Sequence, residues 1–166
     1  MKGEDAVRRF VLPGGTVRGQ HVRLAAAWQL LREHGGYPEP VRDLLGEAAA
    51  AAVLLAATLK FDGTLTLQLQ GNGAIRLLVA QCSNRFELRA VARYDAARVQ
   101  PEFATLIGAG QITVTIDTQS AGGARYQGIV PTDGASLARC LEHYFDRSEQ
   151  LPTALLLSAD ADTAAG

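Results

Sequence analysis

The chain has 166 residues and a mass of 17.6 kDa, the size of one domain with a substantial hydrophobic core. Its 48% hydrophobic and 20% charged residues exclude a disordered chain, and a net charge of −1 with 6% aromatic residues gives no indication of nucleic-acid binding. No apolar run is as long as a membrane span, and the charged start Met1–Asp5 does not resemble a signal peptide. We therefore expect a cytoplasmic protein without membrane or nucleic-acid partners.

The first part of the chain predicts a strand followed by two helices. Valine and leucine alternate with polar residues over 16–24, which is typical of a half-buried strand. Apolar residues recur at helical spacing in 25–34, and a pair of glycines ends that segment. Residues 41–59 carry apolar side chains at i, i+3, i+4 and i+7 and are rich in alanine. We expect this second helix to be buried on more than one face.

The middle of the chain predicts antiparallel strands joined by tight turns. Leucine alternates with threonine and glutamine in 64–70, and Asp62–Gly63 is a turn signal just before it. Residues 101–106 predict a short helix, and 119–123 predict a loop. The expected strands are 64–70, 75–81, 86–92, 111–117 and 126–130.

The last part of the chain predicts a helix over 136–148 and a final strand over 154–158. Residues 159–166 are mostly small, as at the start of a linker or in a terminal tail, so we expect one domain over 1–158. Helices and strands follow one another without regular β-α-β alternation. The fold class predicted from this order is α+β, with antiparallel β-sheets packed against several helices.

Candidate sites for chemistry are sparse. Cys82 and Cys140 lie far apart and form no C-x-x-C or C-x-C pair, so they predict neither a zinc site nor a dithiol redox motif. The histidines are scattered, and we expect no metal and no cofactor. Nothing resembles a catalytic constellation, so we do not expect an enzyme. An enzyme or small-molecule binder stays an alternative that would need Lys60, Asp62 and Arg125 to converge in a pocket.

Residues 140–153 read C-L-E-H-Y-F-D-R-S-E-Q-L-P-T, and this wording strongly resembles the heat shock protein 33 family of bacterial redox-regulated chaperones. Six further motifs follow the order found in that family and extend the resemblance over residues 6–157. They are V-R-G at 17–19, Y-P-E-P-V at 37–41, A-T-L-K-F-D-G at 57–63, L-Q-L-Q-G-N-G at 67–73, R-A-V-A-R at 89–93 and R-Y-Q-G-I-V at 125–130.

The resemblance implies the N-terminal core domain of that family. Its members are ATP-independent holdases, which bind unfolding proteins during oxidative or heat stress and prevent aggregation. Their redox switch is a C-terminal domain in which four cysteines hold zinc, and those cysteines are absent from this chain. We therefore expect a core whose partners are unfolded or partly folded proteins, which can form a homodimer, and which binds clients or self-associates without an oxidant.

No motif locates the client-binding surface, so we predict it from two apolar segments. The first is the strand with Ile112, Val114 and Ile116, and the second is the run Leu155, Leu156 and Leu157 near the expected linker. A fixed dimer interface on the same apolar surface is a further alternative to client binding.

Overall fold

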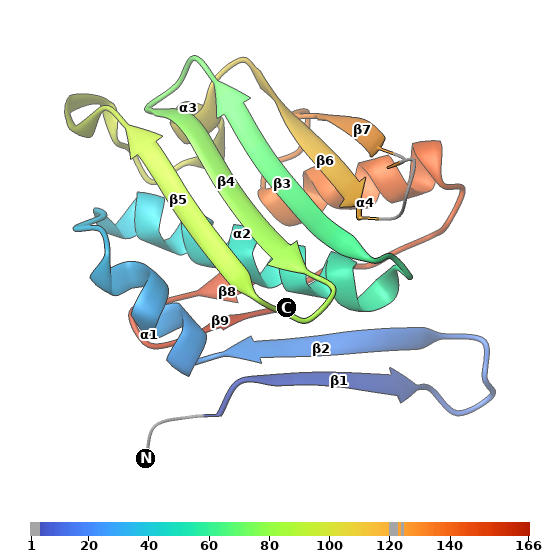
Figure 1. Ribbon diagram of the computed structural model, residues 1–166. Helices are drawn as coiled ribbons and strands as arrows, with labels where there is room; N and C mark the ends of the chain where they lie inside the picture. The colour runs from blue at the N-terminus through green and yellow to red at the C-terminus, as the bar shows by residue number, and fades with distance from the viewer. Residues whose placement is uncertain (1–3, 120–122, 124) are drawn as a thin grey trace.

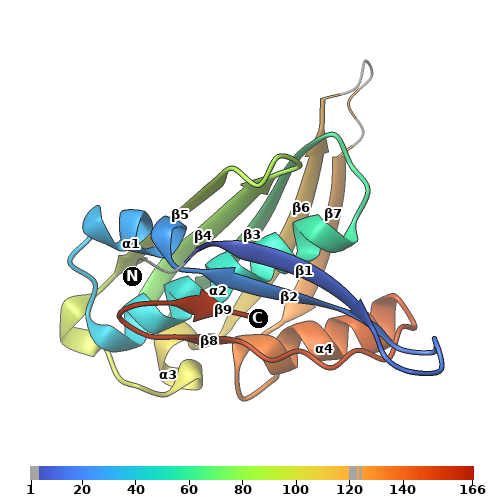
Figure 2. The same ribbon diagram turned by 90° about the horizontal axis from the view of Figure 1, so that it is seen from below.

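A computed structural model describes residues 4–119, 123 and 125–166 and shows two antiparallel sheets packed with helices (Figure 1). This confirms the predicted α+β class. Helix α2 (Glu39–Thr58) lies between the two sheets and contacts strands of both, as the view from below shows (Figure 2). The core is therefore layered as sheet, helix and sheet.

The larger sheet has five strands in the order β5-β4-β3-β6-β7, all antiparallel. In its centre Leu65, Leu67 and Leu69 of β3 pair with Ile116, Val114 and Ile112 of β6, so these side chains share one face. That face is covered by helices, and the expected strand patterns are confirmed. The strands are β3 (Gly63–Gly71), β4 (Ile75–Ser83), β5 (Leu88–Tyr94), β6 (Gly110–Thr118) and β7 (Arg125–Pro131).

Helix α2 is the centre of the core. Fourteen of its 20 residues are buried, which confirms that it packs on more than one face. Its small side chains let the second sheet approach closely: a Cβ on Gly46 would lie 2.5 Å from the Cβ of Ala159. Arg9 Nη2 and Gln20 Nε2 donate to the carbonyl oxygen of Ala57 at 3.1 and 2.9 Å. These two bonds satisfy a carbonyl at the C-terminal end of the helix, where a cation is also favourable.

The smaller sheet has four strands in the order β1-β2-β9-β8. Strands β1 (Ala6–Val11) and β2 (Arg18–Leu24) form a long hairpin, and helix α1 (Ala26–Glu33) follows it. Strands β8 (Ser158–Ala159) and β9 (Ala164–Ala165) are short, and β9 pairs with β2. Gly166 and Val22 exchange both backbone hydrogen bonds, at 2.6 and 3.1 Å, which extends this pairing.

Two expectations for the end of the chain are wrong. The strand expected over 154–158 is absent, because residues 151–157 pair with no other strand and only Ser158 belongs to β8. The N–H of Leu155 donates instead to Glu142 Oε1 at 2.7 Å. The segment 159–166, expected to begin a linker or tail, contributes β9 to the smaller sheet, and Ala164 is fully buried there.

The remaining helices close the core at its ends. Helix α4 (Leu137–Ser148) begins at Ser136, whose hydroxyl accepts from the N–H of Arg139 at 3.2 Å as a regular N-cap. Helix α3 (Phe103–Ile107) and the 3₁₀ turn Ala96–Arg98 connect β5 to β6. The loop expected over 119–123 lies largely outside the described residues.

Candidate functional site

The predicted residues of β6 lie on the covered face of the larger sheet. Ile112 is fully buried, Val114 is nearly so, and Ile116 is partly buried and packs against the core. The sheet alternates its side chains between two faces, so the leucines of β3 and these residues point toward α2 and α4 together. In this arrangement none of the three presents an open apolar surface to a partner.

The predicted run Leu155–Leu157 forms an extended strap between α4 and β8. Leu155 and Leu157 pack against the core, whereas Leu156 is 87% exposed. The bond from the N–H of Leu155 fixes the strap to α4 and is the main reason that the pKa of Glu142 lies below its ordinary value. The structure therefore separates the six predicted residues, and Leu156 alone among them is exposed.

The opposite face of the larger sheet carries no covering element among the described residues, because α2 and α4 both lie behind the sheet (Figures 1 and 2). One row of paired residues crosses all five strands on this open face. We call it the open-face row, and its members are Val91, Val79, Gln68, Thr113 and Ile129.

The centre of the open face is polar and its bonds are satisfied. Gln81 Nε2 donates to Thr66 Oγ1 at 3.0 Å, and Gln127 Nε2 donates to Thr115 Oγ1 at 3.4 Å. The ends of the open-face row are apolar instead: Val91 on β5 is 49% exposed and Ile129 on β7 is 60% exposed. Exposed apolar side chains on a sheet face without a covering layer are candidates for contact with another chain.

A shallow hollow of about 290 Å³ lies at the β5 end of this row. Its lining combines the apolar residues Val79 and Val91 with the polar residues Gln81 and Arg89. It opens widely to solvent and gathers no cluster of titratable side chains, so it suits an apolar side chain of a partner better than an enclosed small molecule.

Helix α4 is held against β7 by side chains from the segment that resembles the heat shock protein 33 family. The hydroxyl oxygens of Tyr126 and Tyr144 are 2.6 Å apart, and they lie 3.2 and 3.1 Å from Glu149 Oε1. Burial, helped by these hydrogen bonds, raises the pKa of Tyr144. The bonds fix the strand that presents Ile129, so the motif stabilises the open face without forming part of it.

A second cluster joins α4 to the loop that precedes it. Asp133 accepts from Arg147 Nη1 at 3.1 Å and lies 3.2 Å from His143 Nδ1. The hydrogen bond to His143 holds the pKa of Asp133 below its usual value. The three side chains are exposed, so we interpret the cluster as a surface contact that orients α4.

Both cysteines are buried and reduced. Burial raises the pKa of the Cys82 thiol to about 11, and burial also raises that of Cys140. A thiol reacts with oxidants as its thiolate, so neither side chain has the properties of a redox sensor.

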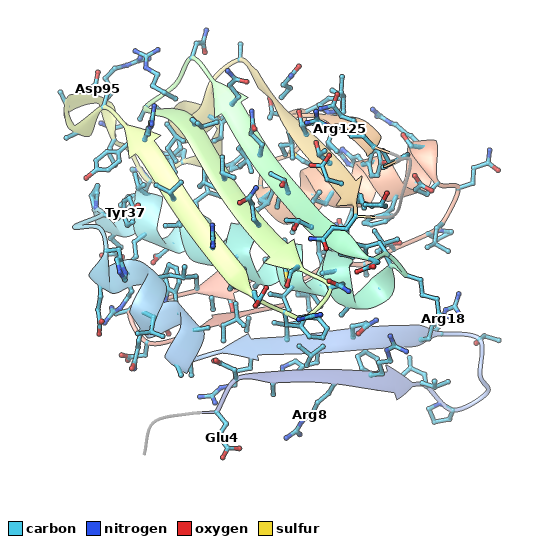
Figure 3. All side chains as sticks on the ribbon, in the orientation of Figure 1. Glu4, Arg8, Arg18, Tyr37, Asp95 and Arg125 are labelled. Atoms are coloured by element: carbon cyan, nitrogen blue, oxygen red, sulfur yellow. The ribbon has the colours of Figure 1, made fainter. Side chains whose placement is uncertain are left out.

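The alternative polar site does not assemble. Asp62 Oδ1 accepts from Asn84 Nδ2 at 3.1 Å, and Lys60 is exposed. Arg125, labelled in Figure 3, pairs with Asp117 at 3.4 Å. Across residues 4–119, 123 and 125–166 no group of histidine, cysteine and carboxylate side chains is arranged to hold a metal ion. Within the same residues, no helix combines the length and the hydropathy needed to cross a membrane.

Sequence reasoning missed Val91 and Ile129. The signal was present, since each is an apolar residue at a strand position where alternation calls for a polar one. Alternation identifies the core face of a strand, whereas an apolar residue on the other face indicates an exposed apolar position. In Arg89–Arg93 the flanking arginines mark that face as exposed, and Val91 lies between them.

Comparison with known proteins shows which family the chain is similar to. Residues 5–166 match the family described as Hsp33 protein. The "33 kDa chaperonin" of Azotobacter vinelandii is 47% identical over 169 residues, covering 100% of this chain and 56% of the relative. That of Ectopseudomonas mendocina is 45% identical over 164 residues, covering 98% of this chain and 55% of the relative. The chain thus spans little more than half the length of these relatives.

A crystal structure of the 33 kDa chaperonin (heat shock protein 33 homologue) from Thermotoga maritima has the same fold. It aligns with a TM-score of 0.78 at 24% identity, over 96% of this chain and 59% of that one. The family match, the two relatives and the resemblance of residues 140–153 agree with one another. The chain belongs to the Hsp33 protein family.

Proposed function

We propose that this chain is the core of an ATP-independent holdase chaperone, which binds unfolding proteins under heat or oxidative stress and prevents their aggregation. Membership of a family whose relatives are named chaperonins supports a chaperone role. The observation that carries the proposal is the open-face row, where Val91 and Ile129 are exposed on the face of the larger sheet that no described element covers. We include Leu156 in the client surface, and place the protein in the cytoplasm.

The proposed binding does not require oxidation of this chain. The apolar ends of the open-face row are exposed while both cysteines are reduced, and both thiols are buried. We therefore expect suppression of client aggregation in fully reducing buffer. The same apolar surface supports a homodimer as the competing arrangement, in which two open faces cover each other.

The test is light scattering from a heat-unfolding client protein, with and without this chain, under reducing conditions. Ile129→Ser and Val91→Ser should each weaken suppression severalfold, because each removes an exposed apolar side chain from the proposed surface. Leu30→Ser is the matched control, since Leu30 on α1 is also 60% exposed but lies away from the open face.

Circular dichroism first establishes that all three variants are folded. Equal suppression by Ile129→Ser, Val91→Ser and the unchanged chain would contradict the open face as the client surface. Sizing over a concentration series then separates client binding from self-association, because a fixed dimer interface would bury these residues at every working concentration.

A further inference from the structure

The hairpin of β1 and β2 carries features that the proposed function does not use. It extends along one side of the molecule, and β1 lies at its outer margin with no described element beyond it (Figures 1 and 2). Five of β1's six residues are exposed, which is unusual for a strand in a folded sheet. An edge strand of this kind is a template for pairing with another extended chain.

The register identifies the groups on the free edge. The N–H of Leu12 donates to the carbonyl oxygen of Val17. Since hydrogen-bonded positions alternate along an antiparallel pair, the even-numbered residues of β1 direct their N–H and C=O groups toward β2. Val22, which faces Val7, exchanges its hydrogen bonds with Gly166 on the other side of β2. By alternation, Val7, Arg9 and Val11 direct N–H and C=O groups to the free edge.

The side chains beside this edge are cationic. The hairpin has four arginines and no acidic residue from Ala6 to Leu24. Arg9 donates to the carbonyl oxygen of Ala57, and Arg23 donates to the carbonyl oxygen of Glu4 at 3.4 Å. Within the part of the chain that the structure describes, Arg8 and Arg18 have no hydrogen-bond or ion-pair partner, and Arg8 extends away from the body in Figure 3.

An apolar hollow adjoins the start of β1. It measures about 210 Å³, and its lining includes Val7 of β1, Val53 of α2 and Phe86 of the β4–β5 turn. Val7 lies on the face of the hairpin that is directed inward, together with the buried Val22 opposite it. Arg8 and Phe10 lie on the other face, directed outward.

These two faces define what an added strand must look like. A residue beside Val7 would reach the apolar hollow, while the next residue along the added strand would face outward beside Arg8. An apolar residue therefore suits the first position and a carboxylate the second, since opposite charges on neighbouring strands are stabilising. Alternation of the two side-chain types satisfies both faces at once.

We propose that the free edge of β1 binds an extended segment of a partner protein in which apolar residues alternate with carboxylates. The segment adds to the smaller sheet as a fifth strand, next to β1, by β-augmentation. This goes beyond the proposed function, because the site is separate from the open face and its occupancy is measured without any aggregating client.

The side chains of the hairpin argue against two other occupants of this edge, a second copy of the chain and a nucleic acid. Two-fold antiparallel pairing of β1 with a second copy, centred on Arg8 or on Arg9, would place that arginine opposite its own copy, and like charges directly opposite are destabilising. A nucleic acid would use the arginines, but the exposed aliphatic residues Val7 and Val11 offer nothing to phosphates. Phe10 is the one phenylalanine of the hairpin, which has no tyrosine or tryptophan for bases to stack on.

The test is fluorescence anisotropy of labelled peptides added to the complete chain. One peptide alternates valine and glutamate, and a second has the same composition with its glutamates grouped together. We expect the alternating peptide to bind at least about tenfold more tightly, the sum of several cross-strand pairs. Equal affinities would overturn the proposal, as would an alternating valine and lysine peptide that binds as well as the glutamate peptide.

Variants of the edge sharpen the result. Val7→Pro removes an N–H from the free edge and leaves the bonds to β2 in place, so it should abolish binding, whereas Val7→Thr keeps that N–H and should retain most of it. Arg8→Glu should weaken binding severalfold, and Arg76→Glu, an equal change of charge on the exposed part of β4, should not.

Three further outcomes would overturn the proposal. One is unchanged peptide affinity in Val7→Pro and Arg8→Glu. Another is a labelled single-stranded RNA that binds more tightly than the alternating peptide and displaces it. The last is a dimer, seen by light scattering, that Arg8→Glu strengthens and the peptide cannot dissociate. If Val7→Pro fails to fold, Arg8→Glu and Arg76→Glu decide the question.

Discussion

The covered and open faces of the five-stranded sheet are built from the same strands but have different neighbours. On β3, Leu65, Leu67 and Leu69 are fully buried beneath α2, while Thr66 and Gln68 on the opposite face are only partly covered. The covered face has a continuous apolar layer. The open face has a satisfied polar centre with Val91 and Ile129 near its margins.

The difference separates two tasks within one sheet. Burial of the leucines supplies stability, because removing apolar surface from water is the largest favourable contribution to folding. The open face contributes little to the core, so its apolar residues can be changed or occupied by a partner without unfolding the domain. If this division holds, substitutions on the two faces should affect different measurements.

The largest effect expected from this comparison is on stability. Leu67→Ala should lower the free energy of unfolding by about 2–5 kcal/mol, because a fully buried leucine in the central strand leaves a cavity. Gln68→Ala, on the adjacent open-face position, should change it by at most about 0.5 kcal/mol. Urea unfolding followed by circular dichroism measures both, and similar losses in the two variants would show that the faces are not energetically distinct.

A smaller effect on stability is expected from a partly buried carboxyl group on α2. Burial, and then the nearby carboxylate of Asp43, raise the pKa of Glu47 on α2 from 4.5 to about 7. The folded state thus holds this proton more tightly than the unfolded state. The stability that Glu47 provides is complete below pH 4.5 and is lost as the pH rises through about 7.

Glu47→Gln should therefore stabilise the chain at pH 8 by about 1–2 kcal/mol, a value reduced for the water that reaches this side chain, and have little effect near pH 5. The measurement is urea unfolding of both proteins at several pH values. Asp43→Asn is the control, because it keeps Glu47 buried and removes the neighbouring charge. It should weaken the pH dependence of the free energy of unfolding, but less than Glu47→Gln does. A stability difference that is constant with pH would contradict this account.

Much of the fold could be predicted because its strands and its central helix have strong periodicity. Alternation in 64–70 identified the central strand, and the helical repeat over 41–59 identified α2 to within a few residues. The end of the chain was mispredicted, since a run of leucines at 155–157 is typical of a buried strand. There the backbone donor of Leu155 is taken by Glu142, a contact between residues 13 positions apart that local patterns do not reveal.

The short strands β8 and β9 could not have been predicted from local sequence. Each has two residues, and small side chains such as Ala164 and Ala165 have no periodic pattern. Their pairing depends on the room that Gly46 and the alanines of α2 leave beside them. The position of the open face is likewise a property of the assembled layers, because alternation distinguishes two faces of a strand without showing which neighbours cover each.

The smallest effect expected is an absence of change on oxidation. Cys82 lies on the covered face of β4, and burial raises the pKa of its thiol to about 11, so almost none of it is thiolate at neutral pH. Treatment of the folded chain with hydrogen peroxide should leave both thiols unmodified and client suppression unchanged, as measured by mass spectrometry and light scattering. Gln70→Cys introduces a thiol at an exposed open-face position of β3, and this thiol should be oxidised readily in the same experiment. Rapid modification of Cys82 in the folded protein would show that the covered face opens under these conditions, and would remove the reason for expecting oxidant-independent binding.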